Sequence, residues 1–506
     1  MAISAPIGLK AAFLEAARTK SGLAATAMLG FLILLAVLVP LLVPFDVVRQ
    51  WSNPGQWSDN PKLVPPEWSE VFTGKRQPRT VIIPPAGQSG GFDHVRVSFE
   101  VQGQNYTIVV LKQSFDFQAD AFPSEISLYM TTMFGSKSPL VRSWLTRPDG
   151  QEVQLFEDTP SLRASNVSQF RPADVITYSL TYPSFKDPSY QVYANVKQWL
   201  ISNNVTTSGE WGELFPSPTG FYSNPPKAQV LLMAQLNHSM LDPRTAQVLK
   251  GKYSIKFEVD GFSSVDDANA RAVVFGTVYG LIGTDDQRRD LLIALLWGAP
   301  VALAFGLAGA LATVLIQTIL GAISGWYGGA VDELVQRTAD FYLIIPTLPI
   351  LILIGILYRP SLILILFILV VFGVVGATTK VTRSIVLQVK EEQFIEAARS
   401  YGASRGRILF RYILPRVMPY TFALIALTVP AFIFLEASLS FLGLGDPNLP
   451  TWGQLLGNAY GAGPAIFYTF WWWVFFPAAG IIFTTVAFAL LGYAFDKVLN
   501  PRLREQ

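Results

Sequence analysis

The sequence predicts an α-helical membrane protein with six transmembrane helices and a β-rich domain inserted after the first of them. Three observations lead to this fold class. Apolar residues make up 51% of the 506 residues, charged residues make up 15%, and the mean hydropathy is +0.37, which is typical of membrane proteins. Six apolar segments are long enough to cross a bilayer as helices. Residues 46–280, in contrast, contain no segment of that length.

The first apolar segment, residues 23–45, follows the basic residues Lys10, Arg18 and Lys20. It is longer than the apolar part of a signal peptide and lacks a small-residue cleavage site. We therefore expect residues 1–45 to form a cytoplasmic N-terminus and a retained transmembrane helix.

Residues 46–280 are rich in Pro and Gly and contain segments of alternating polarity, such as 95–101 and 106–111. Alternation of β-forming residues predicts half-buried strands. Residues 147–150 read Arg-Pro-Asp-Gly between the apolar segments 140–146 and 152–156, which predicts a hairpin turn. A further strand is predicted at 252–259. We expect this region to be a folded, β-rich domain.

Residues 281–506 again contain long apolar segments, and we expect five transmembrane spans there. A long apolar stretch from 291 to 326 is interrupted by Gly298-Ala299-Pro300, which predicts a short interfacial helix before a span at 301–326. The other spans are predicted at 335–357, 361–379, 418–439 and 471–493. Trp471-Trp472-Trp473 at the start of the last one is a typical interfacial anchor.

Charge sets the expected orientation. The segment between the fourth and fifth spans is strongly basic, and only Glu391, Glu392 and Glu396 oppose its cations. Those cations are Lys380, Arg383, Lys390, Arg399, Arg405, Arg407, Arg411 and Arg416. The positive-inside rule places this segment in the cytoplasm. Six spans then put both termini in the cytoplasm of a multi-pass cell-membrane protein, and they put the β-rich domain outside.

The most specific local signal lies in this basic segment. Glu396-Ala397-Ala398 stands on a short amphipathic helical pattern from 391 to 401, and Gly402 follows it. Gly402 can end this helix in the left-handed conformation, and Ser404 can cap the next one. Leu414-Pro415 is predicted to mark the start of the fifth span. Two short helices at an angle would form an exposed projection that a partner protein could bind. The alternative is a solvated basic loop that only sets the orientation of the protein in the membrane.

This spacing resembles the EAA loop of binding-protein-dependent ABC importers, with Tyr412 where the common pattern has Ile. Further segments resemble the dipeptide/oligopeptide/nickel branch and its C-type permease. They are 283–286 with Arg289-Asp290, 325–329 with Asp332-Glu333, 436–445, 450–453 and the tail 500–504. Arg288 stands where that branch usually has glycine. The similarity covers residues 283–506 and loosely the first span, but not the insertion.

The resemblance implies the type I permease fold of ABC importers. It further implies that Glu396, Ala397, Ala398, Gly402, Leu414 and Pro415 belong to the coupling helix that contacts an ATPase subunit. The implied partners are a homologous second permease subunit, two ATPase subunits, an extracytoplasmic substrate-binding protein and the lipid bilayer. Peptides are the implied substrate. Oligosaccharides are an alternative, and metal chelates also remain open.

Several chemistries are excluded by the residues themselves. The chain has no cysteine and two histidines, which disfavours metal sites and excludes thiol catalysis. It lacks a phosphate loop and the common hydrolase signatures. We therefore expect no catalytic residues, metal or cofactor, and ATP hydrolysis in separate subunits. A net charge of +2 gives no reason to expect nucleic-acid binding.

Few ionisable residues lie near the apolar spans, and such residues are functional candidates. Asp340 and Glu436 are the candidates for the translocation pathway. The alternatives are that Asp340 pairs with Arg337 three residues away, and that Lys380 reaches the membrane edge. The glycines and prolines at 443, 445, 447 and 450 predict non-helical backbone, either a re-entrant loop or an external loop.

Two rival functions make different predictions. A membrane-anchored receptor with an external β-domain would need a cytoplasmic effector domain, for which residues 494–506 are too short. An ion-coupled transporter would need several intramembrane carboxylates. For the insertion itself, we expect a role in docking the binding protein or capping the outer mouth, with a rigid spacer as the alternative.

Overall fold

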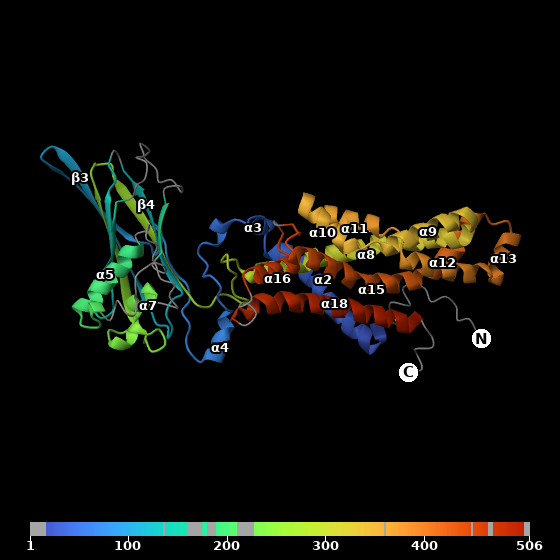
Figure 1. Ribbon diagram of the computed structural model, residues 1–506, viewed down its shortest axis with the longest axis horizontal. Coiled ribbons are helices and arrows are strands. Elements are labelled where there is room, and N and C mark those ends of the chain that lie inside the picture. The colour runs from blue at the N-terminus through green and yellow to red at the C-terminus, as the bar shows by residue number, and fades with distance from the viewer. Residues whose placement is uncertain are drawn as a thin grey trace. The chain divides into compact units, whose positions relative to one another are not determined.

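A computed structural model describes residues 17–134, 137–159, 175–179, 189–209, 227–358, 361–446, 449–463 and 469–499. Lys10, Pro447 and the tail 500–504, which entered the sequence predictions, lie outside these residues. The chain forms two compact units. A helical unit comprises Met1–Asn53 and Leu291–Gln506, and a β-rich unit comprises Pro54–Asp290 (Figure 1).

The helical unit consists of long helices that run side by side (Figure 1). Within the described residues, four helical segments are long and apolar enough to cross a membrane, and there are up to six if each of two bent pairs counts as one span. The helices are α2 (Lys20–Leu42), α3 (Phe45–Arg49), α8 (Leu291–Tyr327), α9 (Gly329–Ile344), α10 (Thr347–Tyr358), α11 (Leu362–Phe372), α12 (Ala377–Lys390), α13 (Gln393–Ser400), α14 (Arg405–Ile408), the π-helical turn η5 (Leu409–Ile413), α15 (Leu414–Phe441), α16 (Trp452–Gly461) and α18 (Trp471–Leu499).

Helix α8 is continuous through Pro300, so the predicted break into an interfacial helix and a span is wrong. A neighbouring helix supports the turn before the proline. The indole of Trp452 donates to the Leu295 carbonyl (2.9 Å). A Cβ on Gly298 would lie 2.3 Å from the Trp452 indole nitrogen. Because residue 298 is glycine, the Trp452 ring can pack directly against the α8 backbone. This contact lies next to Pro300, which has no N–H to donate to the preceding turn.

The two bent pairs break at residues that disfavour helix. The axis turns by 69° between α9 and α10, where Ile345 has extended backbone (φ −68°, ψ 122°) because it precedes Pro346. Between α11 and α12 the turn is 43°, and Gln317 of α8 donates to the freed carbonyl of Gly373 (2.7 Å). Broken backbone in a membrane needs such protein partners.

The β-rich unit contains two antiparallel sheets. The strands are β1 (Val81–Ile83), β2 (Asp93–Val101), β3 (Gln104–Phe117), β4 (Glu125–Met133), β5 (Leu140–Thr146), β6 (Glu152–Asp158), β7 (Val175–Ser179), β8 (Gly251–Gly261) and β9 (Asp267–Phe275). One sheet has the order β1-β9-β4-β7 and the other β2-β3-β8-β5-β6. Strands are thus present at every predicted strand segment, including the hairpin β5–β6.

Turn chemistry sets the hairpins. In the β5–β6 turn, Gly150 has φ +81° and its N–H donates to the Arg147 carbonyl (3.0 Å). In the β2–β3 turn, Gln102 and Gly103 both have positive φ (54° and 78°), as in the two-residue turns that match strand twist.

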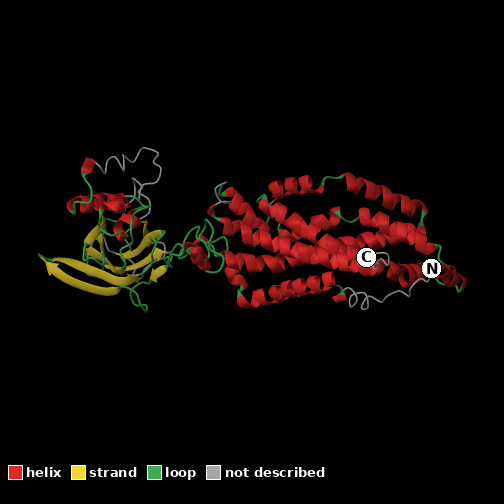
Figure 2. Cartoon of the chain, turned by 90° about the horizontal axis from the view of Figure 1, so that it is seen from below, coloured by secondary structure: helices red, strands yellow, loops and turns green. Residues whose placement is uncertain are grey.

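Apolar side chains of both sheets form one core together with helices α5 (Ser189–Ser202) and α7 (Ala228–Met233). Figure 2 shows helices of this unit lying against one side of the strands. Three short elements, η1 (Pro54–Trp57), η2 (Glu67–Ser69) and α4 (Glu70–Thr73), precede the first strand, and η4 (His238–Leu241) follows α7.

Candidate coupling segment and polar sites of the helical unit

Helix α13 has one buried and one exposed face. Ile395 and Ala398 are buried in a cluster with Trp326 of α8, Val386 of α12 and neighbouring apolar side chains. Glu396 and Ala397 are exposed. Among the described residues, the Glu396 carboxylate has no hydrogen-bond or ion-pair partner. The sequence Glu-Ala-Ala thus presents a charge and a methyl group outward while the third residue packs inward.

The turn after α13 is fixed by its own hydrogen bonds. Gly402 is left-handed (φ +74°), and its N–H donates to the Arg399 carbonyl (2.9 Å). The N–H of Ala403 donates to the Ala398 carbonyl (3.0 Å), which completes a Schellman motif. The Ser404 hydroxyl then accepts from the Arg407 N–H (3.4 Å). Both predicted caps are confirmed, and together they set the angle between α13 and the next helix.

The predicted second short helix is α14, and α15 begins at Leu414 with Pro415 in its first turn, as the sequence predicts. The two helices are nevertheless joined into a single helical path from Arg405 to Phe441, where the sequence predicts separate elements. The path contains the π-helical turn η5 directly before Leu414. Proline cannot donate to the preceding turn and its ring crowds that turn, and a π-turn is a common way to accommodate such a defect.

Cations cover the aromatic rings at the base of this segment. The Arg399 guanidinium lies 5.0 Å from the ring centre of Trp326, and the Lys390 ammonium lies 5.9 Å from it. Arg416 lies 4.3 Å from the ring of Phe394. The Arg399 and Arg416 contacts attach α13 to α8 and α15, and the Lys390 contact attaches α12 to the same tryptophan of α8. Phe394 lies within the predicted helical pattern 391–401. Trp326 lies outside it, and the only sequence signal for its role is its place in the 325–329 segment that resembles the permease family.

Two ion pairs join α9 to α12. Asp332 accepts two hydrogen bonds from Arg383 (2.6 and 2.5 Å) and one from Ser324 of α8 (2.5 Å). Asp340 pairs with Lys380 at 2.5 Å; the Asp340 side chain is 61% exposed and the Lys380 side chain 37% exposed. Arg337 pairs with Glu333 instead, so the alternative interpretation, an Arg337–Asp340 pair, is wrong.

Glu436 lies near the far end of α15. Its side chain is buried (3% exposed) and accepts a hydrogen bond from Ser440 (2.7 Å), and the Thr451 hydroxyl is its second partner. Thr451 also caps α16 by accepting from the Gln454 N–H (3.2 Å). Glu436 therefore holds the start of α16 against α15.

The backbone after α15 turns sharply. Gly443 is left-handed (φ +76°), and the Leu444 N–H donates to the Leu439 carbonyl (2.9 Å). Glycines of α16 then allow close contact with α15, because a Cβ on Gly453 would lie 2.3 Å from the Ala437 carbonyl oxygen. Helices α13 and α16 lie at opposite ends of the helical bundle (Figure 1).

The chain is similar in sequence to a known protein family. The profile of the binding-protein-dependent transport system inner membrane component matches residues 317–505. The oligopeptide transport system permease protein OppC of Bacillus subtilis is 36% identical over 224 residues, which are 44% of this chain and 72% of that protein. This chain belongs to the family of binding-protein-dependent transport permeases.

Two further relatives of the permease are similar over comparable lengths. The dipeptide transport system permease protein DppC of Bacillus subtilis is 36% identical and covers 44% of this chain and 68% of its own length. The glutathione transport system permease protein GsiD of Pectobacterium atrosepticum is 31% identical and covers 44% and 73%. All of the candidate residues, from Asp340 to Glu436, lie within the part of the permease that the family profile matches.

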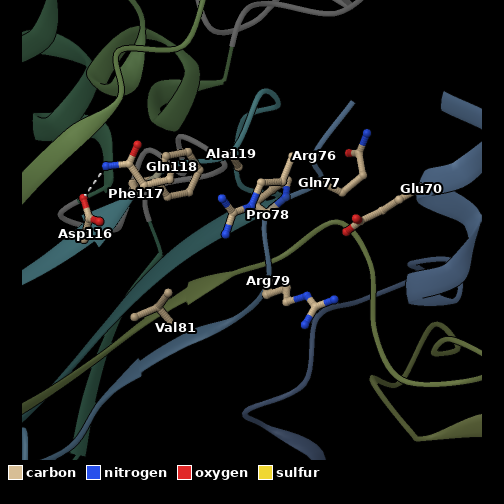
Figure 3. A pocket seen from close by; sticks show the side chains of 10 residues that line it. All are labelled: Glu70, Arg76, Gln77, Pro78, Arg79, Val81, Asp116, Phe117, Gln118 and Ala119. Carbon is tan, nitrogen blue, oxygen red and sulfur yellow. Dashed lines mark hydrogen bonds between the residues drawn. The ribbon is translucent and has the colours of Figure 1, made fainter. Parts of the chain in front are cut away.

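The permease has one cavity beside the Glu436 contacts and another in its β-rich unit. The first, of about 510 Å³, is lined by residues 440–443, Gly445 and one side of α16, including Gln454, Asn458 and Tyr460. The second, of about 400 Å³, is lined by Glu70, Arg76, Gln77, Arg79 and Asp116 among others (Figure 3). Charges of both signs line the second cavity. Within the described residues, no group of His, Cys, Asp or Glu side chains could hold a metal ion.

Proposed function

We propose that the permease forms half of the translocation pathway of an ABC importer, with six spans in the type I permease fold and both termini in the cytoplasm. The observation that carries this proposal is α13, which exposes Glu396 and Ala397 at one end of the helical bundle. In this proposal the two bent pairs, α9 with α10 and α11 with α12, each count as one span. A homologous second permease supplies the other half of the pathway.

Coupling works through rigid contacts. Two ATPase subunits close on ATP, and one of them grips α13 through Glu396 and the small Ala397. Since Ile395 and Ala398 are packed against α8, α12 and the start of the 405–441 path, movement of α13 reaches three helices together. No hydrolysis occurs in this chain. Alternating access follows when those helices open the pathway on one side and close it on the other.

Peptides are the proposed substrate, delivered by an extracytoplasmic binding protein. The names of the oligopeptide, dipeptide and glutathione permeases support this choice. Oligosaccharides and metal chelates would use the same architecture. Asp340 and Glu436 are the proposed polar groups of the pathway. Glu436 acts by holding α16 beside the 510 Å³ cavity, and Asp340 acts through its exposed pair with Lys380.

The coupling proposal is tested in the assembled importer by pairs of variants. Glu396→Lys should leave assembly intact and lower transport per ATP hydrolysed, whereas Glu391→Lys makes the same charge change on an exposed neighbour and should not. Gly402→Val should lower coupling about tenfold, because a β-branched residue in the left-handed region costs on the order of 1–3 kcal/mol. Gly406→Ala is the control, since a Cβ there meets open space in a helix. Unchanged coupling in both Glu396→Lys and Gly402→Val would refute the proposal.

Topology is tested with single cysteines, because the chain has none of its own. Position 150 lies in the exposed β5–β6 turn, and Tyr401 is exposed beside α13. An impermeant thiol reagent added to intact cells should label Gly150→Cys and spare Tyr401→Cys. The reverse pattern would invert the proposed topology. Tyr401 is preferred to Ser404 because the Ser404 hydroxyl caps a helix.

We propose that the β-rich unit lies outside and receives the binding protein. The observation that favours this role over a spacer is the edge strand β2, whose nine residues are all exposed. Val95, Val97 and Phe99 form an apolar row on it. An edge strand with free backbone groups and an apolar face can pair with an incoming chain.

Replacing Phe99–Tyr106 by Asn-Gly shortens the β2–β3 hairpin and keeps the Ser98–Thr107 pair in register. The variant should fold and raise the binding-protein concentration needed for half-maximal transport. The single substitution Gln102→Asn alters the turn alone and is the control. Wild-type concentration dependence in the shortened variant would remove the docking role.

A further inference from the structure

The segments that enter and leave the β-rich unit are joined into one hydrogen-bonded platform, which we define as residues 60–74 and 276–290. The N–H of Leu63 donates to the Asp285 carbonyl (3.0 Å), the N–H of Thr284 donates to the Val64 carbonyl (3.0 Å), and the N–H of Glu67 donates to the Gly280 carbonyl (2.9 Å). The Asp285 carboxylate is fully buried and paired with Arg289 at 2.6 Å. The platform is therefore a fixed part of the fold.

One side of this platform is an exposed apolar patch formed by Trp68, Val71, Phe72 and Leu281. Their exposed fractions are 41%, 82%, 79% and 63%. The Trp68 and Phe72 rings meet edge to face at 6.1 Å, and the Trp68 indole donates to the Leu281 carbonyl (2.8 Å). Scattered apolar residues on a protein surface are ordinary, but a connected patch marks an interaction site.

Helix α4 divides apolar from polar side chains within one turn. Val71 and Phe72 belong to the patch, while Glu70 lines the 400 Å³ pocket together with Arg76 and Gln77 (Figure 3). Lys75 and Arg76 follow directly and are exposed. Apolar and aromatic side chains bordered by cations are the composition of segments that lie in a lipid headgroup layer.

The connection of the platform to α8 indicates that the patch contacts the lipid bilayer. Asp290 is the last residue of the β-rich unit and Leu291 is the first residue of α8. Helix α8 is apolar from that residue onward and is a candidate span. Leu281 is ten residues from Leu291, so even a fully extended chain would separate them by no more than about 36 Å. The chain thus tethers Leu281 within this distance of the residue at which α8 would enter the bilayer.

We propose that the patch of Trp68, Val71, Phe72 and Leu281 inserts into the headgroup layer of the membrane and anchors the β-rich unit at the bilayer surface. The indole hydrogen bond to Leu281 keeps the polar atom of Trp68 satisfied while its ring enters an apolar layer, as interfacial tryptophans do. This inference requires α8 to span the membrane. It depends neither on transport nor on ATPase coupling, and it holds on whichever side of the membrane the unit lies.

The test uses the full-length permease in lipid nanodiscs and a matched pair of valines. Val71→Cys carries an environment-sensitive fluorophore in the patch, and Val97→Cys carries the same fluorophore on exposed strand β2 of the same unit. The lipid contains a spin label on its headgroup or on the upper acyl chain. We expect the spin-labelled lipid to reduce emission at position 71 at least twofold and to leave position 97 unchanged.

A second variant distinguishes insertion of the patch into the headgroup layer from mere nearness of position 71 to the lipid. Phe72→Glu in the Val71→Cys background places a charge in the patch and should abolish the quenching and shift the emission to longer wavelength. Equal emission and equal lack of quenching at positions 71 and 97 would overturn the proposal. So would a short-wavelength emission at position 71 without lipid quenching, because a protein partner would then cover the patch. Since the readout is lipid contact, its failure would leave the transport proposal standing.

Discussion

The two units of the permease treat apolar side chains in opposite ways. In the β-rich unit, Leu111, Leu128 and Leu155 are completely or almost completely buried in a shared core. In helix α2 of the helical unit, the buried residues include Ala25, Leu32 and Val39, spaced seven apart, while most of the other large apolar side chains are exposed. The β-rich unit follows the rules of a protein in water, and α2 keeps only a narrow seam for α8 and α18.

The difference teaches which surfaces need an explanation. Exposed leucines on a membrane helix face lipid or partner helices and are stable there. The same exposure in the β-rich unit is unusual, which is why the patch around Phe72 and the apolar row of β2 stand out. Arg147 of the β-rich unit and Glu436 of the helical unit follow the same rule, since both are buried and both are hydrogen-bonded.

The largest expected effect concerns Arg147, whose side chain is 0% exposed. It donates to the carbonyls of Leu232 (2.5 Å) and Ala234 (2.7 Å) and pairs with Asp149 at 2.9 Å. Its guanidinium also lies 4.8 Å from the Trp199 ring centre. Arg147→Met leaves two buried carbonyls and a carboxylate without their donor, so we expect a loss of about 3–5 kcal/mol.

The measurement is the temperature at which protease cuts the β-rich unit of the full-length permease. The matched control is Arg79→Met, because Arg79 is mostly exposed and pairs with Glu67 at 3.2 Å. Surface pairs of this kind contribute about 0–1 kcal/mol. Equal protease sensitivity of the two variants would show that the Arg147 contacts do not hold the unit together.

The next prediction compares one substitution in the two environments. Leu111→Ala removes a fully buried side chain from the β-rich core and should cost about 2–5 kcal/mol through lost transfer from water and a cavity. Leu32→Ala in the α2 seam should cost less, about 1–2 kcal/mol, because lipid offers leucine an apolar alternative and mainly the cavity remains. Leu41→Ala on the exposed side of α2 should change little.

Thermal unfolding of the full-length permease in detergent, followed separately by protease cleavage of the β-rich unit and by loss of monodispersity, measures these costs. If Leu32→Ala destabilised its unit as much as Leu111→Ala does, the contrast between the two environments would be refuted.

Much of the fold could be predicted because its signals are local. Period-two alternation located β2 and β3, the Arg-Pro-Asp-Gly turn at 147–150 located β5 and β6, and a further strand was predicted at β8. Gly402 and Ser404 predicted the caps at the end of α13 and the start of α14. The break before 301 was predicted wrongly, since the sequence shows Pro300 but not the Trp452 indole that supports the preceding turn. The continuity of the 405–441 path was missed for a similar reason, because a π-turn absorbs Pro415 without ending the helix.

Less of the candidate site could be predicted, because its partners are distant in sequence. The spacing of the residues from Glu396 to Pro415 is local and carried the prediction of a coupling segment. The contact of Arg399 with Trp326 and the pairing of Asp332 with Arg383 join helices more than fifty residues apart, and a single sequence gives no register between helices. The sequence therefore suggested Arg337 as the ion-pair partner of Asp340, whereas the partner is Lys380, for which the sequence suggested only a position at the membrane edge.

A smaller effect than those of Arg147→Met and Leu111→Ala is expected at the close crossing of α15 and α16. A Cβ on Gly453 would lie 2.3 Å from the Ala437 carbonyl oxygen and 2.5 Å from its Cα, and backbone atoms cannot move aside as side chains do. Gly461, in the same helix, has nothing within 4 Å of its Cβ position. Alanine favours a helix over glycine by up to about 1 kcal/mol, so Gly461→Ala should be neutral or slightly stabilising. Gly453→Ala should instead lose about 1–3 kcal/mol through overpacking, seen as a lower temperature of monodispersity loss. If both variants behaved alike, α16 would not be packed on α15 at this distance, and the hydrogen bond from Thr451 to Glu436 would lose its structural basis.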